Sequence, residues 1–151
     1  MTDTVIAALL AWTVSNSGYP MPSTPPALEY RTQAGFAAEV CPQEAVHCAP
    51  RAYYRDGAGT IVLHEAHQHL EDPRSRGLLV HEIVHYLQDL SGRWGEKSCE
   101  SWIEREREAY RLQLLYLVSQ GANPFTLGMP ILNEAGCPAD ARTSMGATTR
   151  R

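Results

Sequence analysis

The residues most suited to chemistry in this chain form the short motif His81-Glu82-Ile83-Val84-His85. Residues four positions apart lie about one turn apart on the same face of a helix, so both imidazoles can reach a single metal ion. Glu82 is turned about a quarter of the way around the helix, where its carboxylate can meet a metal-bound water without binding the metal. Neutral imidazole suits zinc, and a carboxylate beside the water is the general base that a hydrolytic zinc site needs. The motif therefore predicts a hydrolytic zinc site.

The residues around this motif predict that it lies on an amphipathic helix. Asp72 and Pro73 are typical of a helix start, with Asp as the cap and Pro at the first helical position, and Gly92 is typical of a helix end. The apolar residues that share the face opposite the two histidines are Leu79, Ile83, Leu87 and Leu90. We expect this face to pack on a core. The competing interpretation is a helix whose two histidines are merely packed or solvated.

A third ligand must come from elsewhere, because a catalytic zinc ion uses three protein ligands and keeps one position open. The sequence predicts a second long helix over residues 96–120, with Ser98 as its cap and Gly121 at its end. The glutamates of this helix that are candidate ligands are Glu100, Glu104, Glu106 and Glu108.

Helical geometry separates these glutamates. At about 100° per residue, Glu100, Glu104 and Glu108 share a stripe with Arg107 and Arg111, which is typical of a solvated face. Glu106 instead lies on the apolar and small side of the helix, with Trp102, Ile103, Ala109, Tyr110, Gln113 and Leu117. A lone carboxylate on a core-facing side is costly unless it is paired or binds a metal. The geometry therefore predicts Glu106 as the third ligand, in preference to Glu104 or Glu108, and the small Ala109 would let two helices approach closely.

Together the two helices resemble those of the gluzincin class of zinc metallopeptidases. The motif His81-Glu82-x-x-His85 is followed on a later helix by Glu106-Arg107-Glu108-Ala109-Tyr110. The likeness is greatest to small single-domain members, the minigluzincins, whose second motif reads Glu-x-x-Ala followed by Asp or Asn. The resemblance covers about residues 51–120. It implies a zincin-like fold, zinc held by His81, His85 and Glu106, Glu82 as the general base, and a peptide or protein substrate.

The resemblance also carries expectations for a strand and for Tyr110. It implies a sheet edge strand above the metal that holds substrate in extended form, and residues 60–64 are in the right place for it. Tyr110 stands where many relatives have Asp or Asn, which can orient a histidine ligand. Tyr110 is expected either to face the site and stabilise an oxyanion or to be a packed aromatic residue.

The rest of the chain is expected to form short elements around the two long helices. A first helix is expected over residues 4–15, and prolines predict an extended loop over 19–26. Residues 29–40 fit a second short helix or an irregular segment. The β-type runs 51–55 and 60–64 flank a glycine-containing turn and predict a hairpin. The expected fold is α+β, with two long helices packed on a small antiparallel sheet or hairpin and short N-terminal helices.

A chain of 151 residues fits one domain, which we expect over residues 1–138, followed by a flexible tail over 139–151. A second histidine cluster, His64, His67 and His69, has spacings of three and two. These spacings do not match H-E-x-x-H, so we expect a solvated or loop cluster in preference to a metal site.

Composition limits the partners. The formal charge of −4 gives no basic surface for nucleic acid, and no apolar run is long enough to span a membrane. Four cysteines allow two disulfides in three possible connectivities. Cys41 and Cys48 bracket a short loop, so a local bridge between them is one candidate, and it would leave Cys99 to pair with Cys137. The cysteines favour an oxidising compartment, secreted or periplasmic, over four reduced thiols in the cytosol.

Two functions other than peptidase activity fit the same residues. The first is a non-catalytic zinc-stabilised binding or regulatory module, which would favour four protein ligands, with His64 or His67 completing the site. The second is a metal-free helical interaction protein. The intact Glu82 argues against the first, because a structural zinc site has no use for that carboxylate.

Overall fold

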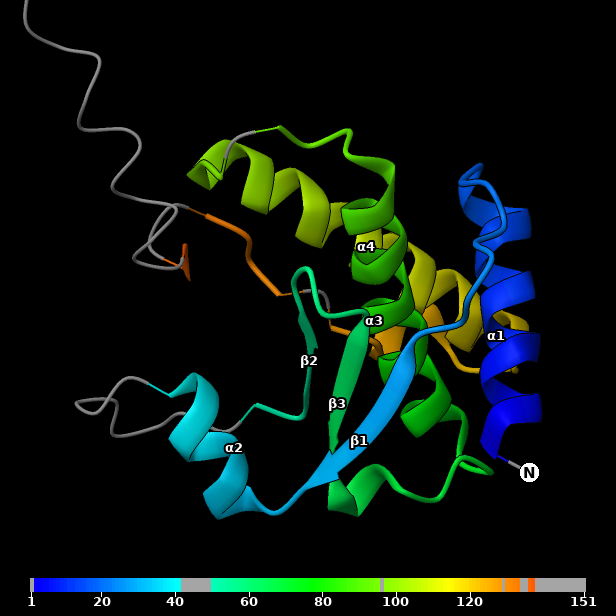
Figure 1. The fold of residues 1–151 in the computed structure, drawn as a ribbon. Helices are drawn as coiled ribbons and strands as arrows, with labels where there is room; N and C mark the ends of the chain where they lie inside the picture. The colour runs from blue at the N-terminus through cyan, green and yellow to red at the C-terminus, as the bar shows by residue number, and fades with distance from the viewer. Residues whose placement is uncertain (1, 42–49, 96, 129, 134–135, 138–151) are drawn as a thin grey trace, which may run out of the picture.

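The computed structural model describes residues 2–41, 50–95, 97–128, 130–133 and 136–137. Its elements, in chain order, are α1 (Thr2–Ser17), β1 (Ala27–Arg31), α2 (Gln33–Val40), β2 (Ala52–Arg55), β3 (Thr60–His64), α3 (Pro73–Ser91) and α4 (Cys99–Ser119). Short 3-10 turns lie at Glu65–His67 and Pro124–Thr126. The described residues thus form an α+β fold in which the helices lie mainly to one side of a small sheet (Figure 1). The expected tail over 139–151 lies outside the described residues.

The two long helices begin and end where the capping residues predict. The Asp72 carboxylate accepts hydrogen bonds from two backbone N–H groups in the first turn of α3, and Gly92 ends that helix in the left-handed conformation with φ of 60°. Ser98 caps α4 through a reciprocal capping box with Ser101. Because Ser98 is the cap, α4 begins at Cys99 and not at residue 96 as expected.

The predicted hairpin is present as β2 and β3, but a third strand joins it and makes the sheet mixed and not purely antiparallel. Its strand order is β1-β3-β2, with β1 parallel to β3 and β2 antiparallel to β3. Residues 29–40 were expected to form a helix or an irregular segment, but residues 27–31 pair with β3 and the helix begins only at Gln33. The short segment 27–31 becomes a strand because β3 offers it backbone partners, which local sequence does not reveal.

Helices α3 and α4 pack along each other behind the sheet, and α1 covers their outer side (Figure 1). Three of the four predicted apolar residues of α3 are buried, whereas Leu90, in the last turn, is 57% exposed. Ala109 is fully buried in the core. At Gly77 an added Cβ would stand only 3.0 Å from the Leu117 side chain, so α3 and α4 pack closely there. None of the described helices is long and apolar enough to cross a membrane.

Two side chains of α3 hold the neighbouring loops in place. The Asp89 carboxylate accepts hydrogen bonds from the Gly57 N–H, at 2.9 Å, and from the Tyr54 hydroxyl, at 2.6 Å. The Tyr86 hydroxyl donates to the Thr24 carbonyl in the proline-containing loop. The β2–β3 hairpin is therefore fixed to the helix that carries the histidine motif.

The expected disulfide between Cys99 and Cys137 is present and ties the start of α4 to the C-terminal segment. Cys41 is also disulfide-bonded, but its expected partner, Cys48, lies outside the described residues.

Candidate metal site and cleft

Three side chains from α3 and α4 converge on one point. The Nε2 atoms of His81 and His85 are 3.1 Å apart, and each approaches one carboxylate oxygen of Glu106, at 3.3 and 3.1 Å respectively. One ligand atom from each residue lies within 4.8 Å of the other two. No other such group of three occurs among the described residues. These three residues are those predicted from the sequence, and together they could hold a metal ion.

Each histidine is held from behind by a glutamine amide. The Nδ1 atom of His81 lies 3.1 Å from Oε1 of Gln113 on α4, and the Nδ1 atom of His85 lies 2.8 Å from Oε1 of Gln88 on α3. An amide oxygen at Nδ1 fixes the ring orientation and directs Nε2 at a metal. In many gluzincins an Asp or Asn at the position of Tyr110 can orient a histidine ligand, and here Gln113 makes this contact with His81.

The surroundings of Gln88 determine which ring nitrogen of His85 carries the proton. The Gln88 NH2 group donates to the Arg105 carbonyl at 3.0 Å and to the Glu108 carboxylate at 2.9 Å. The amide oxygen therefore faces His85 and must accept, so His85 donates from Nδ1. Its Nε2 atom is left with a lone pair for a metal. Gln88 is 1% exposed, so water cannot replace these contacts.

Glu108 departs from its predicted role. Its carboxylate accepts hydrogen bonds from Tyr19, at 2.7 Å, as well as from Gln88, so it is not part of a solvated face. Glu104 and Arg107 do form an exposed ion pair, as expected of the stripe. The sequence could not reveal the role of Glu108, because its partners come from the loop after α1 and from α3.

The two carboxyl groups nearest the histidines have opposite pKa shifts. Burial raises the pKa of Glu82 to about 7, and the negative charge of Glu106 adds to the effect, while His81 and a backbone hydrogen bond from Tyr54 lower it. Burial also raises the pKa of Glu106, but the His81 and His85 rings beside its carboxylate oxygens outweigh burial and bring it below its ordinary value. Glu106 is thus charged, whereas Glu82 is poised to take up or release a proton near neutral pH.

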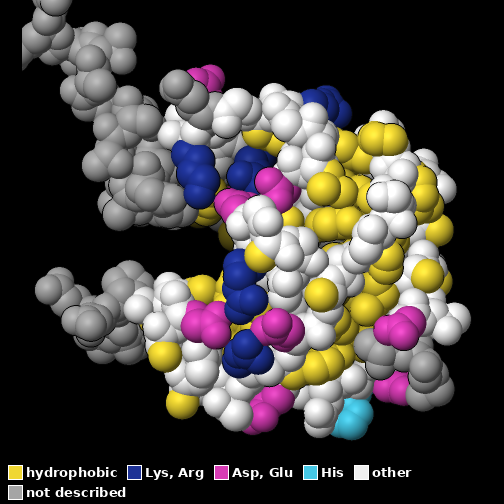
Figure 2. Space-filling model, in the orientation of Figure 1, with side chains coloured by type: hydrophobic (Ala, Val, Ile, Leu, Met, Phe, Trp, Pro, Cys, Tyr) yellow, Lys and Arg dark blue, Asp and Glu magenta, His cyan; other side chains and the backbone are white. Residues whose placement is uncertain are grey.

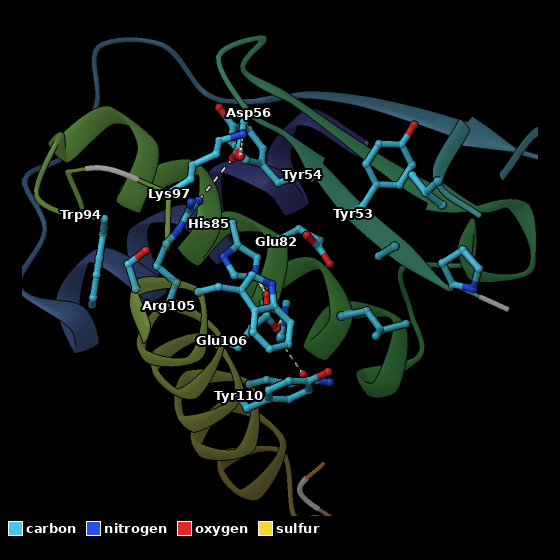
Figure 3. Close-up of a pocket in the computed structure, with 18 of the residues that line it drawn as sticks. Tyr53, Tyr54, Asp56, Glu82, His85, Trp94, Lys97, Arg105, Glu106 and Tyr110 are labelled. Atoms are coloured by element: carbon cyan, nitrogen blue, oxygen red, sulfur yellow. Dashed lines mark hydrogen bonds and ion pairs between the residues drawn. The ribbon is translucent and has the colours of Figure 1, made fainter. Parts of the chain in front are cut away.

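A cleft of about 980 Å³ opens above these residues, lined by side chains of both long helices and by β2. Glu82, His85, Glu106 and Tyr110 point toward it (Figure 3). The space-filling view shows the hollow between the part of the surface carrying α2 and the part carrying the start of α4 (Figures 1 and 2).

The strand along this cleft is β2, not β3. Residues 60–64 were expected to be the edge strand, but β3 lies between β1 and β2 and is central. The N–H of His64 donates to the carbonyl of Arg51, so these two residues face each other as a hydrogen-bonded pair. Along the antiparallel strands β2 and β3, hydrogen-bonded pairs alternate with pairs whose backbone groups point away from the partner strand. By that alternation the backbone groups of Ala52 and Tyr54 point away from β3, on the cleft side. The hydrogen bond from Tyr54 to Glu82 agrees with this direction.

One end of the cleft is closed by ion pairs. Asp56, in the β2–β3 turn, accepts from Arg105 at 3.2 Å and lies 3.6 Å from Lys97 in the α3–α4 connection. These contacts tie the hairpin to α4 (Figure 3).

Tyr110 and the second histidine cluster have separate places. The Tyr110 ring packs edge-on against His81, with centroids 4.4 Å apart, and Tyr110 lines the cleft. His64 accepts from the Ala66 N–H, and His67 lies 3.2 Å from the Ser75 hydroxyl. His64, His67 and His69 lie at the end of β3 and in the turn after it, as the loop interpretation predicted, and they do not contribute to the metal-binding group.

Comparison with known proteins places the chain in one family. The model of the family described as a domain of unknown function (DUF6647) matches residues 1–142, so the chain belongs to that family. The match includes all the residues of the metal site and cleft. No curated protein and no solved structure shows significant similarity to the chain.

Proposed function

We propose that this member of the DUF6647 family is a zinc-dependent metallopeptidase with a zincin-like fold. The observation that carries the proposal is the convergence of His81, His85 and Glu106, with the buried Glu82 beside them in a cleft. Both histidines are held at Nδ1, so the site is arranged for a metal at Nε2. The two motifs that resemble the gluzincins supply the residues of this site.

The spacing of the donor atoms suits zinc. Around a tetrahedral zinc ion with bonds of about 2.0–2.1 Å, neighbouring ligand atoms stand about 3.3 Å apart. The two Nε2 atoms stand 3.1 Å apart, and the nearest carboxylate oxygens of Glu106 are Oε2, 3.3 Å from His81, and Oε1, 3.1 Å from His85. Two neutral imidazoles and one carboxylate are also a common ligand set for catalytic zinc. The residues present therefore fit this ion.

The reaction we infer is peptide bond hydrolysis, with Glu82 as the proton carrier. Zinc, when bound, would polarise the carbonyl and make the attacking water more acidic. Glu82 takes a proton from that water while the water oxygen forms a bond to the carbonyl carbon. The C–N bond then breaks, and Glu82 passes the proton to the leaving nitrogen.

We infer that β2 holds the substrate. A peptide added along β2 would exchange hydrogen bonds with the cleft-side backbone groups of Ala52 and with the Tyr54 carbonyl, and so would lie extended above Glu82. The Cys99–Cys137 disulfide supports our proposal that the protein works in an oxidising compartment, secreted or periplasmic.

The alternative, a non-catalytic zinc module, predicts a fourth protein ligand. Within the described ranges the metal group has three members, and His64 and His67 bond to other groups. The buried Glu82 also has no role in that alternative.

The Glu82→Gln variant tests the proposal. Zinc content, measured by elemental analysis, should equal that of the wild type, and cleavage of unfolded casein should disappear. His81→Ala should lose both zinc and cleavage. Casein cleavage by Glu82→Gln at the wild-type rate would exclude Glu82 as the base, and a purified protein without zinc affinity would exclude the site.

A further inference from the structure

A second cavity of about 500 Å³ adjoins the cleft on the His81 side. Its lining shares Arg51, Leu78, Tyr110 and Gln113 with the cleft. Since Gln113 is hydrogen-bonded to His81 and Tyr110 packs against the His81 ring, this cavity is lined by two residues that contact His81 directly. A substrate residue next to the scissile bond would therefore place its side chain here.

The cleft and the second cavity differ in whether their charged side chains form ion pairs. In the cleft, Asp56 pairs with Lys97 and Arg105, and Glu39 pairs with Arg31 and Arg55. Of these residues, two carboxylates and two cations line the cleft itself, so the pairs leave little net charge there to attract a substrate group; they are Glu39, Asp56, Lys97 and Arg105.

Arg51 is different, because it has no carboxylate within ion-pair distance among the residues described here. Its backbone is fixed by the hydrogen bond to His64, and it is exposed at the junction of the two cavities. Arg74 adds a second guanidinium to the second cavity, and Asp72 beside it accepts hydrogen bonds from the start of α3. Burial and the charge of Arg51 lower the pKa of His67, which is therefore neutral at pH 7. The second cavity is thus positive overall.

We propose that this second cavity binds an acidic side chain of the substrate next to the scissile bond, with the Arg51 guanidinium as its principal partner. The inference rests on the proposed peptidase function and adds a substrate class to it. The neighbouring apolar residues Leu78, Leu114 and Leu117 would contact the methylene groups of a glutamate side chain.

The test uses the zinc-loaded full chain and pairs of fluorogenic peptides that differ only in Glu or Gln. The substituted position is moved residue by residue along the peptide, starting beside the cleaved bond. At one position we expect kcat/KM to favour Glu by about tenfold, the value of one charge-assisted hydrogen bond at a partly solvated site. Arg51→Gln should bring this ratio to near one, Arg51→Lys should keep part of it, and Arg51→Glu should invert it. Arg111→Gln, on the exposed side of α4, should keep the wild-type ratio.

A binding measurement separates failure of this inference from failure of the proposed function. Fluorescence anisotropy of labelled Glu and Gln peptides on the Glu82→Gln variant reports affinity without cleavage, and the Glu peptide should bind more tightly only while Arg51 is present. Cleavage without any Glu preference, or a preference that Arg51→Gln leaves intact, would refute the role of the cavity. If no peptide is cleaved, the peptidase proposal fails, and the binding preference alone decides whether the cavity selects acidic groups.

Discussion

The glutamine behind His85 offers the sharpest test of how the metal site is built. Gln88→Leu keeps the side-chain volume nearly constant but removes all four hydrogen bonds of the amide, to His85, Arg105 and Glu108. In this variant Arg105 keeps its ion pair with Asp56, and Glu108 keeps its hydrogen bond from Tyr19. Each of these two residues therefore loses only part of its polar contacts. His85 loses the contact that defines its orientation.

The magnitude follows from these contacts. A buried group left without its partner costs about 1–3 kcal/mol, and each partial loss adds roughly 0.5–1 kcal/mol. We expect Gln88→Leu to lower the unfolding free energy of the metal-free protein by about 3 kcal/mol. Loss of the contact behind a histidine ligand lowers metal affinity by about 10–100-fold, so zinc binding should weaken by roughly 1.4–2.7 kcal/mol. Gln113→Leu should cost less in stability and in affinity, because Gln113 lines the cleft and water can replace its oxygen.

Two assays measure these effects separately. Urea denaturation in the presence of a chelator gives the stability of the metal-free protein, and competition with a chromogenic chelator gives zinc affinity. Gln120→Leu, at the exposed end of α4, is the matched control and should change neither quantity. Wild-type zinc affinity in Gln88→Leu would show that the amide does not orient His85, and the assignment of its proton to Nδ1 would fall with it.

Three further outcomes are expected. If Tyr110 stabilises the oxyanion, Tyr110→Phe should lower kcat by about 10²–10³-fold without changing zinc affinity or KM, whereas unchanged kcat would identify a packed aromatic residue. Zinc in excess should raise the unfolding free energy, by about 4 kcal/mol at a thousand times Kd, and His81→Ala should abolish this rise in thermal denaturation. Gly35→Ala should stabilise α2 by about 0.5–1 kcal/mol, whereas Gly77→Ala should show no such gain, because the new Cβ would meet Leu117. Urea denaturation of both variants measures the difference, and equal gains in stability would contradict the close approach of α3 and α4.

The three residues of the candidate metal group could be predicted from the sequence because each depends on the geometry of one helix. His81 and His85 are one turn apart, and Glu106 is the carboxylate on the apolar side of its helix. Capping residues such as Asp72 and Ser98 likewise act on their own helix, so the helix boundaries follow from local chemistry.

The features that were missed depend on contacts between distant segments. Periodicity placed Glu108 on a solvated stripe, but Tyr19 and Gln88 reach it from other elements. The strand at 27–31 forms because β3 is available as a partner, and this same pairing makes β3 central and β2 the edge. Gln88 gave no signal because a buried amide in a helix is recognised only by its hydrogen-bond partners.

The contact between Asp89 and the β2–β3 hairpin has a consequence for how the activity could diversify. Asp89 lies about two turns beyond His81 on α3. The same helix therefore positions both Glu82 and, through Asp89, the edge strand β2. A shift of α4 would disturb the Glu106 contact and the Asp56–Arg105 pair, while the Asp89 contacts would still hold β2 beside Glu82. On the function that we propose, related chains could change α4 and the surrounding loops, and with them substrate choice, while the distance between a peptide on β2 and Glu82 stays constant.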